Sequence, residues 1–507
     1  MASLPLHLCL PLLLLLLLLL FTLLLLLKKK LYSTHLPPGP LRLPIIGNLH
    51  QLGALPHYSF WQVSKKFGPV MLLQFGRVPT VIISSAETAK ELIKTNDLSS
   101  CSRPRLAGTG RLSYNFLDIA FTPYGDYWRV MRKICVHELF SAKRVQSFQS
   151  IREEEVGLLI DSILKSSSSS TPVDLSEKTM SLTANVICRV AFGKSFQERG
   201  FNHERFQEVV REGLAMLGSF TAADFFPHVG WIVDRLTGLH ARSDRVFKEF
   251  DDFYQKIIDD HIQKGKEDPG HEDIIDVLLD LERYQTESGG IPFSQNHIKA
   301  MLMNIFLAGV DTGAIVLIWA MAELIRDSRV MRKAQLEIRS LIGDKRNVSE
   351  SDTGKLDYLK LVLKETMRLH PPVPLLVPRE AISQFSINGY EVYPKTQIRV
   401  NVWAIGRDPK IWKNPEEFSP ERFINSSIDF RGQNYEFLPF GGGRRICPGM
   451  TMGMTLVELA LANLLFCFDW KLPYNMKEED INMEEEFGLT AEKKEALLLV
   501  PIKYHLE

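Results

Sequence analysis

A glycine-rich loop around a single cysteine constrains this chain more than any other segment. It reads Phe440-Gly-Gly-Gly-Arg-Arg-Ile-Cys447-Pro-Gly449, so three consecutive glycines and two adjacent arginines precede the sulfur. Glycine lets a backbone approach a flat ligand closely. The apolar run that follows predicts a helix from Met450 to Phe468, with the sulfur near its N-terminus. Free N–H groups and the helix dipole at that end lower the pKa of a thiol.

Two interpretations of Cys447 follow from this context. A lone cysteine is most often a small buried hydrophobic side chain, but that interpretation leaves the glycines and arginines without a role. A thiolate that binds haem iron explains all of them. We therefore expect Cys447 to be the axial ligand, and we expect Phe440, Gly443, Arg445 and Gly449 to form the rest of the cofactor-binding loop.

Composition excludes some classes of protein. The chain has 507 residues, 45% of them hydrophobic, and its 60 basic side chains balance 60 acidic ones. A nucleic-acid-binding protein would show a basic excess, so none is expected as a partner. The six cysteines have neither paired spacing nor a CxxC metal motif, which is typical of a reducing compartment; they are Cys9, Cys101, Cys135, Cys188, Cys447 and Cys467.

The N-terminus predicts a membrane anchor. Leu8 to Leu27 is almost unbroken apolar sequence, and three lysines end it. About 20 apolar residues span a bilayer as a helix, and a cleaved signal peptide would carry its positive charge before the run. We therefore predict a signal anchor over 1–30, in the endoplasmic reticulum membrane, with the rest of the chain in the cytosol.

A proline-rich hinge over 31–45 follows, containing Leu36-Pro-Pro-Gly-Pro-Leu41. Clustered prolines forbid helix and stiffen a connection, which suits a plain spacer or a strut that orients the domain on the membrane. No composition break follows, so 46–507 is expected to be one catalytic domain.

The remaining pattern predicts a mainly α fold with a minor β-sheet (α+β). Val70–Gln74 and Thr80–Ser84 are short apolar segments typical of strands. From Ala86 to Arg326 the pattern is mostly helical, and Phe487–Tyr504 suggests a terminal hairpin. The aromatic stretch from Asp224 to Trp231 suits either the core or a membrane interface.

An acid and a hydroxyl lie side by side within a long apolar segment. Ala308-Gly-Val-Asp311-Thr312 falls between Ile298 and Ile325. The threonine hydroxyl can bond the carbonyl of Ala308 and bend the helix, which would be a purely structural role. An apolar helix rarely carries such a pair without use, so Asp311 and Thr312 are also candidates to relay protons to bound dioxygen.

Two further motifs combine a helix with charge. Glu365 and Arg368 share a helix face, and Arg422 of Pro-Glu-Arg-Phe supplies a third charge for a buried structural cluster. A weak surface ion pair is the alternative. Trp128 and Arg132 are one helical turn apart and suit a haem propionate. Further candidates for the propionates are Arg379 and Arg445.

Together these motifs resemble those of the cytochromes P-450, the haem-thiolate monooxygenases, over essentially the whole chain. The proline hinge, the Pro-Glu-Arg-Phe motif and the Cys447 loop are most similar to microsomal plant enzymes of the A-type branch, which serves specialised metabolism. The resemblance implies the P-450 fold behind one transmembrane helix, haem b (iron protoporphyrin IX), and oxygen activation by Asp311 and Thr312. One departure is Gly313, where the family commonly has a second hydroxyl residue.

The resemblance also implies a reaction. One atom of O₂ enters a hydrophobic small molecule (a terpenoid, alkaloid, phenylpropanoid or aldoxime), and NADPH-cytochrome P-450 reductase delivers the electrons. Basic side chains near the thiolate, such as Lys133, Arg444 and Arg445, are candidates to guide that reductase. The expected substrate pocket consists mainly of apolar residues, each of which equally suits core packing: Phe116, Phe121, Met301, Ile305, Ala308, Gly309, Leu375, Leu376, Val377 and Leu489.

Two alternatives stay open from the sequence. One is a haem-thiolate isomerase or dehydratase that needs no reductase, and the other is a haem-binding membrane protein without turnover. The pair Asp311-Thr312 argues against both, because relatives that do not activate oxygen tend to lack it.

Overall fold

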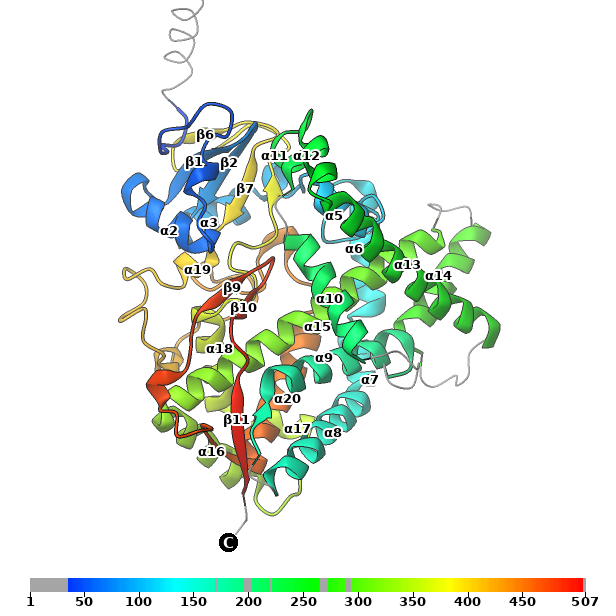
Figure 1. Ribbon diagram of the computed structural model, residues 1–507, viewed down its shortest axis with the longest axis vertical. Coiled ribbons are helices and arrows are strands. Elements are labelled where there is room, and N and C mark those ends of the chain that lie inside the picture. Colours follow the sequence, from blue (N-terminus) through cyan, green and yellow to red (C-terminus); the bar gives the residue numbers. More distant parts are fainter. Residues whose placement is uncertain are drawn as a thin grey trace, which may run out of the picture.

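The computed structural model describes residues 35–168, 171–195, 203–218, 221–264, 272–288 and 293–504. The predicted anchor, 1–30, and the start of the hinge lie outside these residues. The described chain is rich in helix and has small sheets (Figure 1). This agrees with the predicted fold class.

The helices of the described chain fall into long and short ones. The long helices are α2 (Pro56–Phe67), α6 (Asp126–Ile134), α8 (Gln149–Ser167), α9 (Leu175–Phe192), α10 (His203–Gly218), α13 (Leu239–Lys264), α14 (Ile274–Ser288), α15 (Gln295–Arg326), α16 (Ser328–Ile342), α18 (Asp357–Leu369) and α20 (Met450–Cys467). The short helices are α3 (Ala86–Lys90), α4 (Asp97–Ser100), α5 (Ala107–Leu112), α7 (Ala142–Ser147), α11 (Ala222–Phe225), α12 (Gly230–Leu236), α17 (Glu350–Thr353) and α19 (Val402–Ile405).

A four-stranded sheet lies at the N-terminal end of the domain. Its order is β1 (Val70–Phe75), β2 (Val78–Ile83), β7 (Gln397–Val400) and β4 (Arg379–Glu380). The two strands predicted from the sequence, Val70–Gln74 and Thr80–Ser84, correspond to β1 and β2. These two pair antiparallel, whereas β2 and β7 are parallel. A separate two-stranded sheet consists of β5 (Phe385–Ile387) and β6 (Tyr390–Val392).

The C-terminal strands differ from the single hairpin that the sequence suggests. A short hairpin joins β9 (Glu485–Phe487) to β10 (Ala491–Lys493). The last strand, β11 (Leu498–Lys503), instead pairs with β3 (Val173–Asp174) and β8 (Phe468–Lys471). Its partners are distant in sequence, so local alternation could not identify them.

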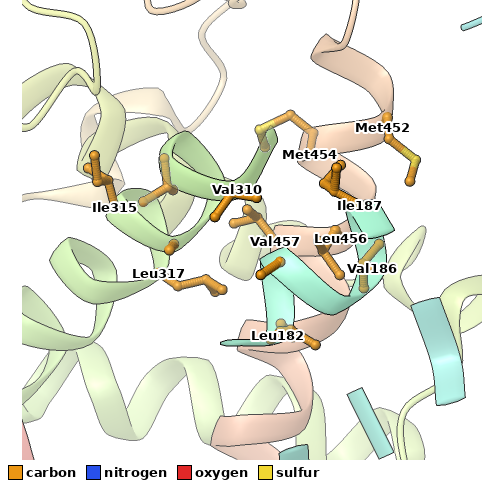
Figure 2. Packing of buried hydrophobic residues seen from close by; sticks show 14 of the residues in the cluster. Leu182, Val186, Ile187, Val310, Ile315, Leu317, Met452, Met454, Leu456 and Val457 are labelled. Atoms are coloured by element: carbon orange, nitrogen blue, oxygen red, sulfur yellow. The ribbon is translucent and has the colours of Figure 1, made fainter. Parts of the chain in front are cut away.

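Helix α15 forms the centre of the core. It packs against α9, α18 and α20, and Figure 2 shows Val310 of α15 among side chains of α9 and α20. A helix that is apolar on all sides must be buried. Among the described residues, α15 and α20 are apolar and long enough to span a bilayer, but 78% and 67% of their most apolar windows are buried, so both are core helices.

The aromatic segment after residue 221 divides between core and surface. Phe225 is buried against Phe75 of the sheet, with ring centroids 5.9 Å apart. Trp231 of α12 is 53% exposed. The backbone carbonyl of Phe225 accepts from the N–H of Arg77 at 2.9 Å, so α11 and α12 lie beside the β1–β2 turn, at the end of the molecule where the described chain begins (Figure 1).

Candidate active site

The loop that carries Cys447 is held in place by the backbone. The N–H of Cys447 donates to the carbonyl of Phe440 at 3.0 Å, and the N–H of Ile446 donates to Gly443 at 3.2 Å. Gly443 has a φ of +65°, and a Cβ there would lie 2.7 Å from an Asp97 carboxylate oxygen, so the turn requires glycine. These contacts present the sulfur immediately before α20.

The environment of the Cys447 thiol is mixed. Burial raises the pKa of this thiol. The backbone N–H groups of Gly449 and Met450 and the guanidinium of Arg132 lower it, but burial is the larger effect. The net direction differs from the sequence-based expectation because burial outweighs the helix end. A thiol that coordinates a metal ion is deprotonated outright, so iron binding would form the thiolate that the helix end alone does not. Cys447 as a whole is partly buried.

All three predicted propionate-binding arginines contact this loop or the segments beside it. Arg445 donates to the carbonyls of Cys101, Ile119 and Thr122 at 2.8–3.2 Å. Arg379 donates to Gly442 at 2.9 Å and pairs with Asp97 at 2.8 Å. Arg132 donates to the carbonyl of Ile446 at 2.6 Å. The predicted Trp128 lies with them: its indole N–H donates to the Ile119 carbonyl at 3.0 Å, and the Arg445 guanidinium lies 4.2 Å from its ring centroid.

A fourth arginine, Arg103, joins this group and was not identified from the sequence. It donates to the carbonyls of Ala120, Val377 and Pro378 at 2.6–2.9 Å. Burial, Arg445 and Arg379 together hold its pKa well below the usual range. It has no motif of its own, and its partners at 377 and 378 lie far away in the chain.

These residues fit a haem. Arg103, Arg132, Arg379 and Arg445 outnumber the two carboxylates beside them, Asp97 and Asp118. Uncompensated buried charge is costly, and the two propionates of a haem would balance the excess. A cysteine thiolate is one of the side chains that hold haem iron, and arginines suit the propionate carboxylates.

In its middle, around Ala308, α15 is less buried than along most of its length. Ala308 is exposed, and Gly309, Thr312 and Gly313 are partly exposed, although most of this helix is buried. The hydroxyl of Thr312 donates to the Ala308 carbonyl at 2.8 Å, as the sequence suggests, and the helix continues without interruption from Gln295 to Arg326.

Gly313 lies between neighbouring helices. A Cβ at this position would be 3.3 Å from the methyl group of Thr183 on α9 and 3.8 Å from Val457 on α20. The Thr183 hydroxyl donates to the Val310 carbonyl at 2.6 Å, which fixes its methyl group. Close packing therefore gives a physical reason for glycine where the family commonly has a hydroxyl residue. The same contacts pack this part of α15 against α9 and α20.

Asp311 is fully buried, and neither carboxylate oxygen has a hydrogen-bond partner among the described residues. Burial and the neighbouring Glu492 raise the pKa of Asp311 to about 8. A carboxyl group with that pKa holds a proton at neutral pH. The side chain that the sequence singles out therefore has the properties of a proton donor.

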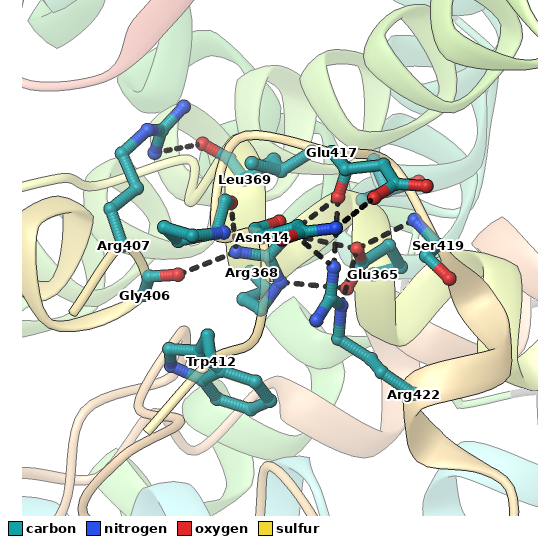
Figure 3. Close-up of polar contacts among 12 residues, drawn as sticks. Glu365, Arg368, Leu369, Gly406, Arg407, Trp412, Asn414, Glu417, Ser419 and Arg422 are labelled. Carbon is teal, nitrogen blue, oxygen red and sulfur yellow. Dashed lines mark hydrogen bonds and ion pairs between the residues drawn. The ribbon is translucent and has the colours of Figure 1, made fainter. Parts of the chain in front are cut away.

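The structure brings the three predicted structural residues together (Figure 3). Arg368 pairs with both carboxylate oxygens of Glu365 at 2.7 and 2.8 Å, and Arg422 donates to Glu365 Oε1 at 2.8 Å. The remaining Arg368 donors bond the carbonyls of Gly406, Pro415 and Glu417 at 2.6–3.1 Å. The cluster therefore ties α18 to the segment from 406 to 422.

The predicted substrate residues fall into two groups. Phe121, Leu375, Leu376 and Leu489 line one cavity, together with Leu106, Thr109, Leu217, Gly218, Asp224, Phe225, Pro374, Pro378, Gln397, Arg399 and Gly488. Phe116 instead lines an adjacent groove, where the guanidinium carbon of Arg105 lies 5.1 Å from the centroid of its ring. The others lie outside both lining sets: Met301, Ile305, Ala308, Gly309 and Val377.

A buried thiol loop, a surrounding arginine cluster and an acid–threonine pair on a central helix define a haem-thiolate protein. Comparison with known proteins agrees. Residues 37–500 match the family described as cytochrome P450. Cytochrome P450 71B10 from Arabidopsis thaliana is 58% identical over 470 residues, covering 92% of this chain and 93% of that protein. Cytochrome P450 71B34 from the same plant is 57% identical over 468 residues, with the same coverage.

A solved structure, a zebrafish cytochrome P450 with abiraterone, is similar with a TM-score of 0.75 and 27% identity, over 90% of this chain and 100% of that one. The chain therefore belongs to the cytochrome P450 family. It is a plant A-type P450 monooxygenase with haem b as its cofactor.

Proposed function

We propose that this protein inserts one oxygen atom of O₂ into a hydrophobic small molecule of plant specialised metabolism, with electrons from NADPH through a membrane-bound reductase. The observation that carries the proposal is the place on α15 where Ala308, Gly309 and Thr312 interrupt an otherwise buried helix, beside a buried acid. A haem in this fold activates dioxygen, and its thiolate ligand favours O–O cleavage.

We assign the side chains as follows. Cys447 holds the haem from the loop before α20, and its neighbours Phe440, Gly443 and Gly449 shape that loop. The arginine cluster binds the propionates, since guanidinium groups suit carboxylates, and Trp128 contributes by supporting Arg445 against its ring. Thr312 holds a hydroxyl where oxygen binds, and Asp311 supplies protons to it. The cluster around Glu365 is structural.

The cavity supports a substrate with a mainly apolar body. Four of the predicted residues, Phe121, Leu375, Leu376 and Leu489, contribute aromatic and aliphatic walls. Polar side chains, among them Thr109, line the same cavity. An apolar pocket with a few convergent polar groups is typical of small-molecule sites. These apolar walls favour the hydrocarbon parts of a terpenoid, alkaloid, phenylpropanoid or aldoxime.

An apolar surface supports attachment to a membrane. Its exposed side chains lie in and just before α12 and at the end of the hinge: Val229, Trp231, Ile232, Val233, Leu236, Leu41, Leu43 and Ile45. Exposed apolar patches of this kind mark interaction surfaces. We assign 1–30 to a single-pass anchor in the endoplasmic reticulum, 31–45 to the hinge and 46–507 to a cytosolic catalytic domain.

For the reductase, two of the three predicted basic residues are accessible. Lys133 is exposed, and Arg444 is exposed while paired with Asp97 at 2.9 Å. Arg445 faces inward onto three carbonyls, so its role lies with the cofactor. Exposed cations steer an acidic partner.

Microsomes that contain the full chain test the proposal. A panel of the four substrate classes is incubated with and without NADPH and co-expressed reductase, and product masses are measured. We expect a product heavier by one oxygen atom, labelled from ¹⁸O₂, only when both are present. Conversion without NADPH would support the isomerase or dehydratase alternative, and haem binding without any conversion would support the non-catalytic one.

A further inference from the structure

The β9–β10 hairpin brings a second carboxylate to the acid of the Asp311-Thr312 pair. β10 packs on α15, where the indole N–H of Trp319 donates to the Ala491 carbonyl at 3.2 Å. The N–H of Ala491 donates to Pro372 at 2.9 Å, so the strand is fixed on both sides. Glu492 is the next residue of this strand.

The Asp311 carboxyl group is faced by two polar side chains of the hairpin, the hydroxyl of Thr490 and the carboxyl of Glu492. Thr490 is buried, whereas Glu492 is only partly buried. A buried carboxyl whose oxygens have no hydrogen-bond partner within the described chain is costly unless it is protonated or used. We therefore expect the neighbouring side chains of the hairpin to take part in the function of Asp311.

The charged side chains next to Glu492 lie on the protein surface. Glu486, the residue directly across the hairpin from Glu492, is exposed. Arg211 of α10 is also exposed, and its charge acts on Glu492. α10 ends against the hairpin tip, because a Cβ at Gly218 would lie 2.4 Å from the backbone nitrogen of Leu489. Titratable side chains thus continue from solvent at Glu486 and Arg211, through Glu492, to Asp311.

We propose that Glu492 is the residue through which protons pass from solvent to Asp311, so that it acts in oxygen activation only through that side chain. The inference rests on the proposed function, which consumes two protons for each O₂. After Asp311 has given its proton toward Thr312, its carboxylate becomes negative and attracts the neighbouring Glu492 carboxyl into a hydrogen bond. The O–H bond of Glu492 then breaks, and a new O–H bond forms on Asp311. Solvent then reprotonates Glu492. One proton moves inward, and no electron is transferred.

The electrostatics of this pair of carboxyl groups favour the protonated form. Burial and the neighbouring carboxyl raise the pKa of Asp311, and burial raises that of Glu492 in spite of the opposing effects of Asp311 and Arg211. Two carboxyl groups held close together retain a proton between them. The pair Asp311–Glu492 therefore holds a proton at neutral pH, and Glu492 can take up another from solvent.

Glu492→Gln, Glu492→Asp and the control Glu495→Gln test the proposal in the full-length enzyme with reductase. Glu495 is exposed just beyond β10. In Glu492→Gln we expect turnover at saturating substrate to fall about 10-fold. This loss is smaller than the roughly 10²–10⁴-fold that a direct general acid contributes, because Glu492 acts through Asp311. We also expect a changed solvent deuterium isotope effect and more reduced oxygen released without product. Glu492→Asp restores most of the rate, and Glu495→Gln changes neither quantity.

Infrared spectroscopy of the resting protein gives a readout that does not depend on turnover. The band of a protonated carboxyl group that disappears in Asp311→Asn should shift in Glu492→Gln and stay unchanged in Glu495→Gln. An unchanged band, or unchanged turnover and isotope effect in Glu492→Gln, would overturn the proposal. If the wild-type protein binds haem but makes no product, the proposed function fails, and the infrared comparison still decides whether the two carboxyl groups are coupled.

Discussion

Arg368 and Glu365 form a bidentate ion pair with no accessible surface on either side chain: Nε lies 2.7 Å from Oε2 and Nη2 lies 2.8 Å from Oε1. Removing one partner of a buried pair leaves the other charge uncompensated and costs about 3–5 kcal/mol. In Arg368→Met three backbone carbonyls also lose a donor. We expect a loss of this size in the free energy of unfolding, measured by urea denaturation, and a lower yield of haem-loaded protein.

The control for this prediction is a surface pair. Lys494 lies 2.7 Å from Glu484, with 56% and 65% of the two side chains exposed. Exposed pairs of this kind contribute little to stability, so Lys494→Met should leave both stability and haem content nearly unchanged. Equal losses in the two variants would show that burial of the Arg368 pair has no special role.

Replacing Cys447 tests the proposed axial ligand. The loop is fixed by backbone hydrogen bonds, including that of the Cys447 N–H to Phe440, which an alanine retains. Cys447→Ala should therefore fold but lose the spectrum of the reduced, carbon-monoxide-bound thiolate complex. Cys135→Ala, which removes another buried thiol, is the control and should keep that spectrum. A normal spectrum in Cys447→Ala would contradict the assignment.

Thr312→Ala removes a hydroxyl whose hydrogen bond is local, to the carbonyl of Ala308. The helix loses little, because alanine has the highest helix propensity. We expect NADPH to be consumed at a similar rate but with much less product and more hydrogen peroxide. The measurement is the ratio of product formed to NADPH consumed. An unchanged ratio would remove the proposed role of Thr312 in oxygen activation.

Gly313→Ala weighs helix propensity against crowding. Alanine gains about 1 kcal/mol over glycine in a helix, whereas overpacking costs about 1–3 kcal/mol. The methyl group would lie 3.3 Å from Thr183 Cγ2, so we expect net destabilisation of about 1 kcal/mol. Gly157 of α8 has open space, and Gly157→Ala should instead stabilise. In a double-mutant cycle, Thr183→Ser keeps the hydroxyl, removes the methyl group and should relieve the crowding.

Sequence reasoning located the parts of the site that short motifs carry. Cys447 and its glycines are contiguous, and Glu365 and Arg368 share one helical turn, so their chemistry is visible locally. Arg103 and Glu492 carry no motif. Arg103 donates to Val377, 274 positions away in sequence, and Glu492 reaches Asp311 only because a hairpin is pinned to α15. Such contacts are products of tertiary packing, which a single sequence does not reveal.

A pair outside the active site predicts a pH dependence of stability. His261 of α13 lies 2.8 Å from Asp273, the residue before α14. Burial lowers the pKa of His261, but the hydrogen bond and charge of Asp273 outweigh burial and raise it above the usual 6.5. Because the pKa of His261 is higher in the folded protein than in the unfolded chain, protonated His261 stabilises the fold. This contribution is fully present below the pKa of the unfolded chain and is lost as the pH rises through the pKa of the folded protein. Urea denaturation from pH 6 to 9 should show this loss, and it should be absent in His261→Gln. A contribution that grows with pH would mean that the neutral imidazole is the favoured partner of Asp273.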